Sequence, residues 1–349
     1  MNDLDLLWRP PARAGRHAVA CLGETMVSFI PTGGAALDTA ASVELEVAGA
    51  ESNVAMYLAD HGVDARWISR LGDDAFGRRV LERVRASGVD VSGVGIDPER
   101  PTGLLFKDPG GRDGGRGTLV TYRRQGSAAS VMSVEALEDE AALTASVWHL
   151  TGITPALSGE CRALVEHALG VGRARDDDRP AVSFDVNYRP AVWRDRSSDA
   201  GDVLHRLAQA ADIVFVGLDE AQALWGERLA EAKDVRTLLP QPRILVVKDG
   251  ATEATAFCGG ASVVEPALRV DVVEPVGAGD AFAAGFLAAL LHGRTAQLCL
   301  RSGHLTAAAA LSVTGDHGPL PAPKIFAELL NASSDEWRTH TQKPRTWTP

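Results

Sequence analysis

Much of the fold follows from the stretch Val273-Glu-Pro-Val-Gly-Ala-Gly-Asp-Ala-Phe-Ala-Ala-Gly-Phe-Leu-Ala-Ala-Leu-Leu291, a turn of small residues followed by a long helical pattern. A glycine turn that opens a helix presents free backbone N–H groups at the positive end of the helix dipole. Such a turn suits an anion, for example a phosphate group. The stretch therefore predicts an anion site at the start of a helix.

Asp280 is unusual in this turn, Gly277-Ala278-Gly279-Asp280, because a phosphate repels a neighbouring carboxylate. One interpretation gives Asp280 a chemical task, in which it accepts a proton from an attacking hydroxyl group. The other makes it a helix cap, a position that favours Asp. The turn alone leaves both interpretations open.

The composition is that of an ordinary globular protein, with 349 residues, 45% hydrophobic and 23% charged. An α/β chain of this length often forms one large domain. The formal net charge of −11 disfavours binding to nucleic acids and to anionic membranes. An anionic substrate would therefore need arginines placed locally around it.

The four cysteines, Cys21, Cys161, Cys258 and Cys299, are far apart and form no metal-binding or redox motif. This pattern is typical of reduced thiols in a cytosolic protein. The acidic N-terminus lacks the apolar core of a signal peptide, and no apolar run reaches the length of about 18 residues that a membrane helix needs. We therefore expect a cytoplasmic protein.

Short β-branched runs alternate with helical patterns along most of the chain, which predicts a mostly parallel sheet with helices on both faces. The expected strands are Val19–Ile30, Ala65–Arg70, Val147–Thr151, Ala181–Asp185, Ile213–Val216 and Ile244–Lys248. The expected helices are Ala50–His61, Asp74–Ser87, Gly159–Arg173, Asp202–Ala210, Asp219–Leu224, Gly279–Leu291, Thr295–Val313 and Pro323–Leu330.

Two regions, at about 25–47 and 102–124, depart from this alternation of strands and helices. In the second region, two strand patterns surround a glycine-rich loop. Alternating apolar and polar residues there predict a small antiparallel sheet with one exposed face. Such a sheet could be a lid, a dimer surface or both, or an inert decoration. The polar segments 1–16 and 333–349 are expected to be flexible ends.

Two separated motifs bear a family resemblance. Ala48-Gly-Ala-Glu-Ser-Asn-Val-Ala55 and Pro275-Val-Gly-Ala-Gly-Asp-Ala-Phe282 resemble, in the same order, the two signatures of the PfkB/ribokinase-like carbohydrate kinases. The resemblance extends over about residues 17–330. It implies one ribokinase-like domain, a three-layer αβα sandwich with a mostly parallel central sheet and a small antiparallel β lid.

The resemblance also implies roles for individual residues. Asp280 would be the general base for the sugar hydroxyl, and the N–H groups of Gly277, Ala278 and Gly279 would form an anion hole for the transferred phosphoryl group. Gly49 would let the backbone approach the substrate. Asn53 would hydrogen-bond a sugar hydroxyl, although an amide on a helix surface is the plainer alternative.

Three further stretches are similar to the 2-keto-3-deoxygluconate kinase branch of this family: Tyr122-Arg-Arg-Gln-Gly-Ser-Ala-Ala-Ser130, His149-Leu-Thr-Gly-Ile-Thr-Pro-Ala-Leu157 and Asp185-Val-Asn-Tyr-Arg-Pro-Ala-Val-Trp193. A sugar acid carries a carboxylate, which Arg can hold through two hydrogen bonds. Arg123 and Arg189 occupy suitable positions. The alternative for both is an ordinary ion pair.

Further positions follow from the resemblance one by one. Asp316 would lie near the substrate, or else serve a turn. Lys248, Gly250 and Asn187 would contact the nucleotide, and Glu220 would act on a metal ion through water. The implied co-substrate is ATP with Mg²⁺, and a monovalent cation is left open.

The chain departs from the family pattern at five positions. Ala48 replaces the first glycine of a Gly-Gly pair, Gly217 replaces an Asn, and Glu253 replaces a glycine of the nucleotide loop. Thr121 and Leu105 stand where the sugar-acid branch often has Tyr. Each lost phenol removes a hydrogen-bond donor, so these changes bear on the substrate more than on the reaction.

The resemblance implies ATP-dependent phosphorylation of the terminal hydroxyl of a keto-deoxy sugar acid, namely 2-keto-3-deoxygluconate to its 6-phosphate. A fructokinase and a 5-keto-2-deoxygluconokinase are the enzymatic alternatives. An inactive sugar-binding regulator is the alternative of another class, and the intact turn with Asp280 argues against it. The exposed lid face suggests a homodimer or a higher homo-oligomer.

Overall fold

The computed structural model describes residues 8–10, 12, 17–108, 119–171, 179–194 and 197–342. Within this part of the chain, nine strands form one large sheet in the order β13-β12-β11-β10-β9-β8-β1-β4-β5. The strands are β1 (Ala18–Leu22), β4 (Asp64–Gly72), β5 (Val94–Asp97), β8 (Val147–Thr151), β9 (Ala181–Asp185), β10 (Ile213–Gly217), β11 (Ile244–Asp249), β12 (Glu253–Cys258) and β13 (Ala261–Pro266). All neighbours pair in parallel except β12, which runs antiparallel to β11 and β13.

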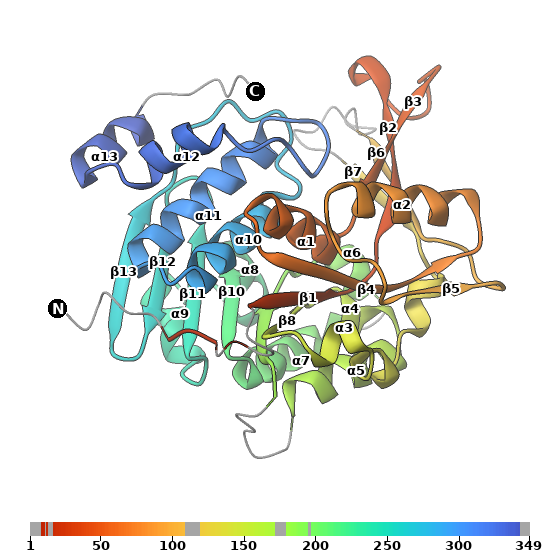
Figure 1. Ribbon diagram of the computed structural model, residues 1–349, viewed down its shortest axis with the longest axis horizontal. Coiled ribbons are helices and arrows are strands. Elements are labelled where there is room, and N and C mark those ends of the chain that lie inside the picture. The colour runs from red at the N-terminus through yellow and green to blue at the C-terminus, as the bar shows by residue number, and fades with distance from the viewer. Residues whose placement is uncertain are drawn as a thin grey trace.

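Helices cover both faces of this sheet (Figure 1). One face is covered by α1 (Ala50–Asp60), α2 (Ala75–Ala86), α10 (Ala278–Leu291) and α11 (Ala296–Leu311). The other is covered by α3 (Glu140–Leu143), α5 (Gly159–Leu169), α7 (Ser197–Ala210), α8 (Leu218–Trp225) and α9 (Ala232–Leu238). The remaining helices are α4 (Thr154–Leu157), α6 (Pro190–Trp193), α12 (Pro323–Leu330) and α13 (Ser334–Gln342).

The first strand shows how the sequence produces two cores. All five residues of β1 are buried, and successive side chains of a strand point to opposite faces. Val19 and Cys21 therefore join the core beneath α1 and α10, whereas Ala20 and Leu22 join the core beneath α5 and α7. A strand buried on both faces reads as a continuous apolar run, as expected for a central strand of an α/β sheet.

A second sheet of four strands stands beyond the end of the main sheet (Figure 1), in the order β3-β2-β6-β7. Its strands are β2 (Met26–Pro31), β3 (Val43–Ala48), β6 (Leu104–Asp108) and β7 (Leu119–Arg123). The β2–β3 and β6–β7 pairs are antiparallel, and β2 meets β6 in parallel. This sheet is the expected lid, and the glycine-rich loop within 109–118 lies outside the described residues.

The expected α/β fold with a lid is confirmed, with one difference near the start. The apolar run Val19–Ile30 forms two strands rather than one, because the chain leaves the main sheet after Leu22 and enters the lid at Met26. Gly23 lies at this exit. A Cβ atom at Gly23 would lie 2.0 Å from the Glu51 carboxyl carbon, so a larger residue would displace this buried side chain.

The C-terminal segment differs from the flexible end expected from residue 333 onwards. Ser334–Gln342 form α13, and its Trp337 is only 1% exposed. The Trp337 indole N–H donates to the Pro266 carbonyl at 3.0 Å, and the Arg301 guanidinium lies 4.8 Å from the ring centre. The flexible-end expectation is therefore wrong for this helix, whereas residues 343–349 lie outside the described part of the chain.

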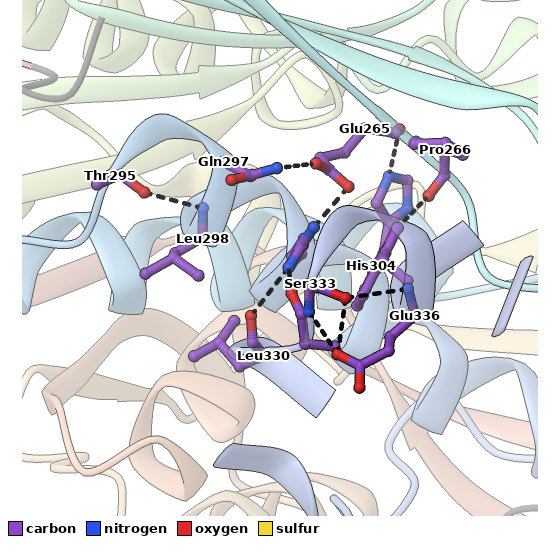
Figure 2. A network of polar contacts seen from close by, with 12 residues as sticks. Glu265, Pro266, Thr295, Gln297, Leu298, His304, Leu330, Ser333 and Glu336 are labelled. Atoms are coloured by element: carbon purple, nitrogen blue, oxygen red, sulfur yellow. Dashed lines mark hydrogen bonds and ion pairs between the residues drawn. The ribbon is translucent and has the colours of Figure 1, made fainter. Parts of the chain in front are cut away.

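Figure 2 shows the polar network on which this helix rests. The carboxylate of Glu265 accepts hydrogen bonds from Gln297 and from Arg301, and the Glu265 carbonyl contacts the His304 ring at 3.1 Å. Arg301 also donates to the Leu330 carbonyl at the end of α12. These contacts tie β13, α11 and the C-terminal helices together.

The cysteines Cys21, Cys161, Cys258 and Cys299 are free thiols, as expected. Among the described helices, none is long and apolar enough to cross a membrane.

Removing the Trp337 side chain tests how α13 is attached. Trp337→Ala should lower the free energy of unfolding by about 3 kcal/mol, because it deletes a buried aromatic side chain. Urea denaturation followed by circular dichroism measures this. Trp337→Phe, which keeps most of the packing but loses the indole donor, should cost clearly less. An unchanged stability of the alanine variant would mean that α13 is not docked as described.

Candidate active site

A pocket of about 380 Å³ lies between the lid and the main domain. It is lined by lid residues from β2, β6 and β7, by the start of α1, by the segment after β9 and by the turn before α10. Seven of the residues expected in the site line this pocket: Gly49, Asn53, Asn187, Arg189, Gly277, Asp280 and Asp316. Segments far apart in the sequence therefore meet where the motifs predicted a common site.

The glycine turn has the geometry that anion binding requires. Gly277 adopts a φ of 87°, in the left-handed region that favours glycine, and α10 begins at the next residue. The first helical hydrogen bond runs from the Ala281 N–H to the Gly277 carbonyl. The N–H groups of Ala278, Gly279 and Asp280 come before it and have no partner in the helix. They form a cluster of donors at the positive end of α10.

Asp280 does not cap this helix, because the N-cap residue is Gly277 and no side chain makes a capping hydrogen bond. Two amides hold the Asp280 carboxylate instead. Asn53 Nδ2 donates to Asp280 Oδ2 at 3.0 Å, and Asn187 Nδ2 donates to Asp280 Oδ1 at 3.1 Å. Of the two interpretations left open by the sequence, the geometry therefore favours the chemical one.

The environment of Asp280 raises its pKa from the ordinary 3.8 to about 7. Burial is the largest cause, and the charges of Asp185 and Asp316 act in the same direction. The hydrogen bond from Asn53 and the charge of Arg189 oppose the shift. The positive end of α10 also favours the charged form, but only by about 0.3–2 kcal/mol, which is less than the desolvation of a fully buried carboxylate. Asp280 is thus near half-ionised at neutral pH.

The side-chain oxygens of Asn53 and Asn187 lack hydrogen-bond donors within the described residues. Each uses its Nδ2 on Asp280, and in the described part of the chain each Oδ1 is buried without a hydrogen-bond partner. Asn187 also has a φ of 37°, which is uncommon for a residue with a side chain. Buried polar atoms without partners are rare and call for an explanation, and strained backbone gathers at functional sites. A hydroxylated ligand would supply the missing donors.

Gly49 is required by close packing of the backbone. It is the N-cap of α1, and a Cβ atom there would lie 2.6 Å from the Glu24 carbonyl oxygen and 2.8 Å from the Thr25 Cα. Gly49 therefore lets the β1–β2 connection rest against α1 while it also lines the pocket.

The structure separates the two arginines proposed to hold a carboxylate. Arg189 lines the pocket, whereas Arg123 is exposed, is absent from the pocket wall and donates to the Tyr122 carbonyl. The neighbouring Arg124 lines the pocket instead, where its Nε donates to the buried Glu24 at 2.6 Å. The expectation for Arg123 therefore needs correction. Tyr122 and Arg124 lie two residues apart and both line the pocket, and this period of two could have identified Arg124 from the sequence.

Lys248 lies behind the glycine turn. A Cβ atom at Gly279 would be 3.3 Å from Lys248 Nζ, and the same ammonium group pairs with Asp185 at 3.2 Å. Gly250, with a φ of 49°, follows at the end of β11. Lys248 thus adds a positive charge next to the N–H cluster, a setting suited to a phosphate chain.

Glu220 is engaged in the protein. Its carboxylate accepts from the Gly217 N–H at 2.8 Å, and burial raises its pKa, with the charge of Lys248 opposing. Among the described residues, no group of three or more His, Cys, Asp or Glu side chains could hold a metal ion. A Mg²⁺ ion here would need water and phosphate oxygens for most of its ligands, which is how this ion is usually bound.

Asp316 lies on the loop after α11 and lines the pocket. Its Oδ2 is 3.4 Å from Asn53 Nδ2, and its Oδ1 accepts from Lys107 Nζ at 2.9 Å. Lys107 comes from lid strand β6 and is buried. The sequence did not single out Lys107, because nothing local indicates a pairing across 209 residues.

A buried carboxylate near neutral pKa, a cluster of N–H donors and a lid define a phosphotransferase for small hydroxylated molecules. Residues 16–323 match the family model described as pfkB family carbohydrate kinase. The chain belongs to this family, as the two signatures implied.

Individual relatives agree with the family. The chain is 35% identical over 324 residues to 2-dehydro-3-deoxygluconokinase of Thermoproteus tenax, covering 93% of this chain and 97% of that one. It is 33% identical to 2-dehydro-3-deoxygluconokinase of Bacillus subtilis, with coverages of 89% and 94%. The crystal structure of a PfkB protein from Polaromonas superimposes with a TM-score of 0.76, at 33% identity and coverages of 91% and 100%.

The pKa of Asp280 predicts how stability depends on pH. Because the folded-state pKa lies above the unfolded value, the stability contributed by the protonated carboxyl is lost as the pH rises from about 4 through 7. Asp280→Asn, which resembles the protonated form, should equal the wild type near pH 4. It should exceed the wild type at pH 8 by at most about 4 kcal/mol.

Thermal unfolding of both proteins across pH 4–8 measures this difference. Asp38→Asn, at an exposed carboxylate between β2 and β3, is the matched control and should give a difference without this rise. A constant difference between Asp280→Asn and the wild type would contradict the raised pKa.

Proposed function

We propose that this carbohydrate kinase transfers the γ-phosphoryl group of ATP to the terminal hydroxyl of a keto-deoxy sugar acid, with 2-keto-3-deoxygluconate as the substrate. The observation that supports the reaction most strongly is Asp280 between Asn53 and Asn187, beside the N–H groups at the start of α10. The names of the two relatives at 33–35% identity support the substrate.

In this reaction the hydroxyl oxygen forms a bond to the γ-phosphorus, the bond between that phosphorus and the ADP oxygen breaks, and the hydroxyl proton passes to Asp280. A base with a pKa of about 7 is suited to this step at neutral pH, because it is ionised in a useful fraction and still basic. Asn53 and Asn187 fix the direction of the carboxylate. The N–H groups of Ala278 and Gly279 stabilise the negative charge on the phosphoryl oxygens.

Arginines at the pocket favour an anionic sugar. Arg124 and Arg189 both line the pocket, and Glu24 fixes the Arg124 guanidinium in place. A guanidinium that is already oriented loses less freedom when it binds a carboxylate. The lid part of the pocket wall also has an apolar patch, with Met26, Leu105 and Val120. This combination suits a molecule with a carboxylate at one end and a carbon without a hydroxyl in its chain.

We further propose that Mg²⁺ accompanies the nucleotide, bound by phosphate oxygens and water, with Lys248 near the phosphates and Glu220 in reach of that water. A homodimer through the lid stays a prediction, supported by the exposed apolar side chains of Val43 on β3 and Leu119 on β7. The location in the cytoplasm likewise stays a prediction.

An ADP-release assay over a panel of sugars and sugar acids tests the proposed substrate. Turnover with ATP and magnesium should be highest on 2-keto-3-deoxygluconate and low on fructose and ribose. Asp280→Asn should lower kcat by about 10²–10⁴-fold while sugar binding persists. Turnover of neutral sugars alone would contradict the acid assignment, and turnover by Asp280→Asn at the wild-type rate would remove Asp280 from the mechanism.

The two neighbouring arginines provide a matched pair of variants. Arg124→Met should raise the KM for the sugar acid about 10- to 100-fold, because it removes charged hydrogen bonds to the carboxylate. Arg123→Met, one residue away but outside the pocket, should stay within twofold of the wild type. Steady-state kinetics on both variants decides, and the reverse order would restore Arg123 as the carboxylate ligand.

A further inference from the structure

Lys107 is a buried cation in a small lid. It lies on β6 and is 2% exposed, and its Nζ lies 2.9 Å from Asp316 Oδ1, which is itself 5% exposed. Lys is almost never fully buried without a partner. A buried ion pair gives little net stability, because desolvation of both charges offsets their attraction. Stability alone therefore does not explain why a lid strand carries this residue.

Asp316, the partner of Lys107, is connected to the proposed base Asp280 through one residue, Asn53. Asn53 Nδ2 lies 3.4 Å from Asp316 Oδ2 and 3.0 Å from Asp280 Oδ2, so one amide group is shared between two carboxylates. Two carboxylates in such a position oppose each other's ionisation, and one of them tends to take up a proton. The Lys107 charge offsets this repulsion on the Asp316 side.

The Asp316 loop is fixed on its other side by the main domain. His317 Nε2 lies 2.9 Å from Asp60 Oδ2, and its Nδ1 lies 3.0 Å from Arg83 Nη2. The Gly318 N–H donates to the Tyr57 hydroxyl at 2.8 Å. These contacts anchor the loop to α1 and α2, so the lid reaches this anchored loop through the Lys107 side chain.

The same loop also touches the anion turn. A Cβ atom at Gly277 would lie 3.0 Å from the Asp316 carbonyl oxygen and 3.2 Å from its Cα, so the two backbones are in contact. Asp316 thus contacts the lid through Oδ1, α1 through Oδ2 and the anion turn through its backbone. A displacement of the Lys107 ammonium would therefore change the contacts of Asp316 with the lid, with α1 and with the anion turn.

We propose that Lys107 is a positioning residue of the sugar site, which holds the Asp316 carboxylate in its orientation and so connects lid strand β6 to the base Asp280 through Asn53. The inference rests on the proposed role of Asp280 in sugar phosphorylation. Lys107 also lines the pocket. Its ammonium group has three N–H donors, and within the described residues Asp316 accepts one of them. The other two are available for substrate oxygens once the lid is closed.

Other charges surround Asp280 and remain in place when Lys107 is changed. They are Asp185 at the end of β9, Arg189 before α6 and Lys248 on β11, and the phenol of Tyr57 on α1 beside them is uncharged. A shift in the pH profile of a Lys107 variant would therefore reflect the loss of the Lys107 charge itself. Removing a positive charge next to a carboxylate pair makes the pair harder to ionise, so the acid limb of activity moves to higher pH.

The experiment compares Lys107→Met and Lys107→Arg with the wild type, using the sugar that the wild type phosphorylates. Lys107→Met should lower kcat/KM for the sugar about a hundredfold, as expected when a binding group is misplaced, with the KM for ATP within twofold. The acid limb of kcat/KM should rise by about one pH unit. Lys107→Arg keeps the charge and should recover most of the activity and the wild-type acid limb.

Lys233→Met, at a lysine that is 70% exposed on α9, is the matched control and should change nothing. If Lys107→Met does not fold, Lys107→Gln, which keeps a donor without charge, should show the same shift of the acid limb. Activity of the neutral variants within twofold of the wild type, or a loss of activity with an unmoved acid limb, would overturn the inference. If the wild type phosphorylates the sugar, either of these results contradicts only the role of Lys107. If the wild type phosphorylates no sugar, the proposed function itself is wrong.

Discussion

The site depends on two hydrogen bonds, from Asn53 and Asn187 to the two oxygens of Asp280. They hold a buried carboxylate in one orientation at the start of α10. Burial destabilises the charged form of the carboxylate, and the hydrogen bonds from the two amides offset part of this effect without neutralising the group. The result is a carboxylate near neutral pKa that faces a cluster of anion-binding donors.

The main domain and the lid supply this arrangement from opposite sides. Asn53 comes from α1, Asn187 follows β9, and Asp280 belongs to α10, so the rigid elements of the main domain define the base. Lys107 lies on lid strand β6, Arg124 directly follows lid strand β7, and both line the pocket. In the proposed reaction the main domain would therefore supply the base, and both the lid and the main domain would supply arginines for an anionic substrate.

The sequence predicted what short periods and contiguous motifs can encode. The alternation of apolar runs and helical patterns located the main sheet, and the motif around Gly277 located the anion turn, because both depend on neighbouring residues. The sequence predicted Arg123 in the pocket, whereas the structure places Arg124 there. The prediction did not use the period of two that places alternate side chains of an extended chain on one face. Lys107 could not be inferred, because its partner Asp316 is brought near only by the fold. The helix α13 was missed because its sequence is polar, and Trp337 docks it through contacts with Pro266 and Arg301.

The proposed reaction depends on a fold that raises the pKa of the Asp280 carboxyl to about 7. Carbon-13 NMR of protein labelled at the aspartate carboxyls, titrated from pH 4 to 9 beside Asp280→Asn, measures this directly. One carboxyl resonance should titrate near pH 7 and be missing from the variant. An Asp280 resonance that titrates near pH 4, as for an ordinary exposed aspartate, would contradict it.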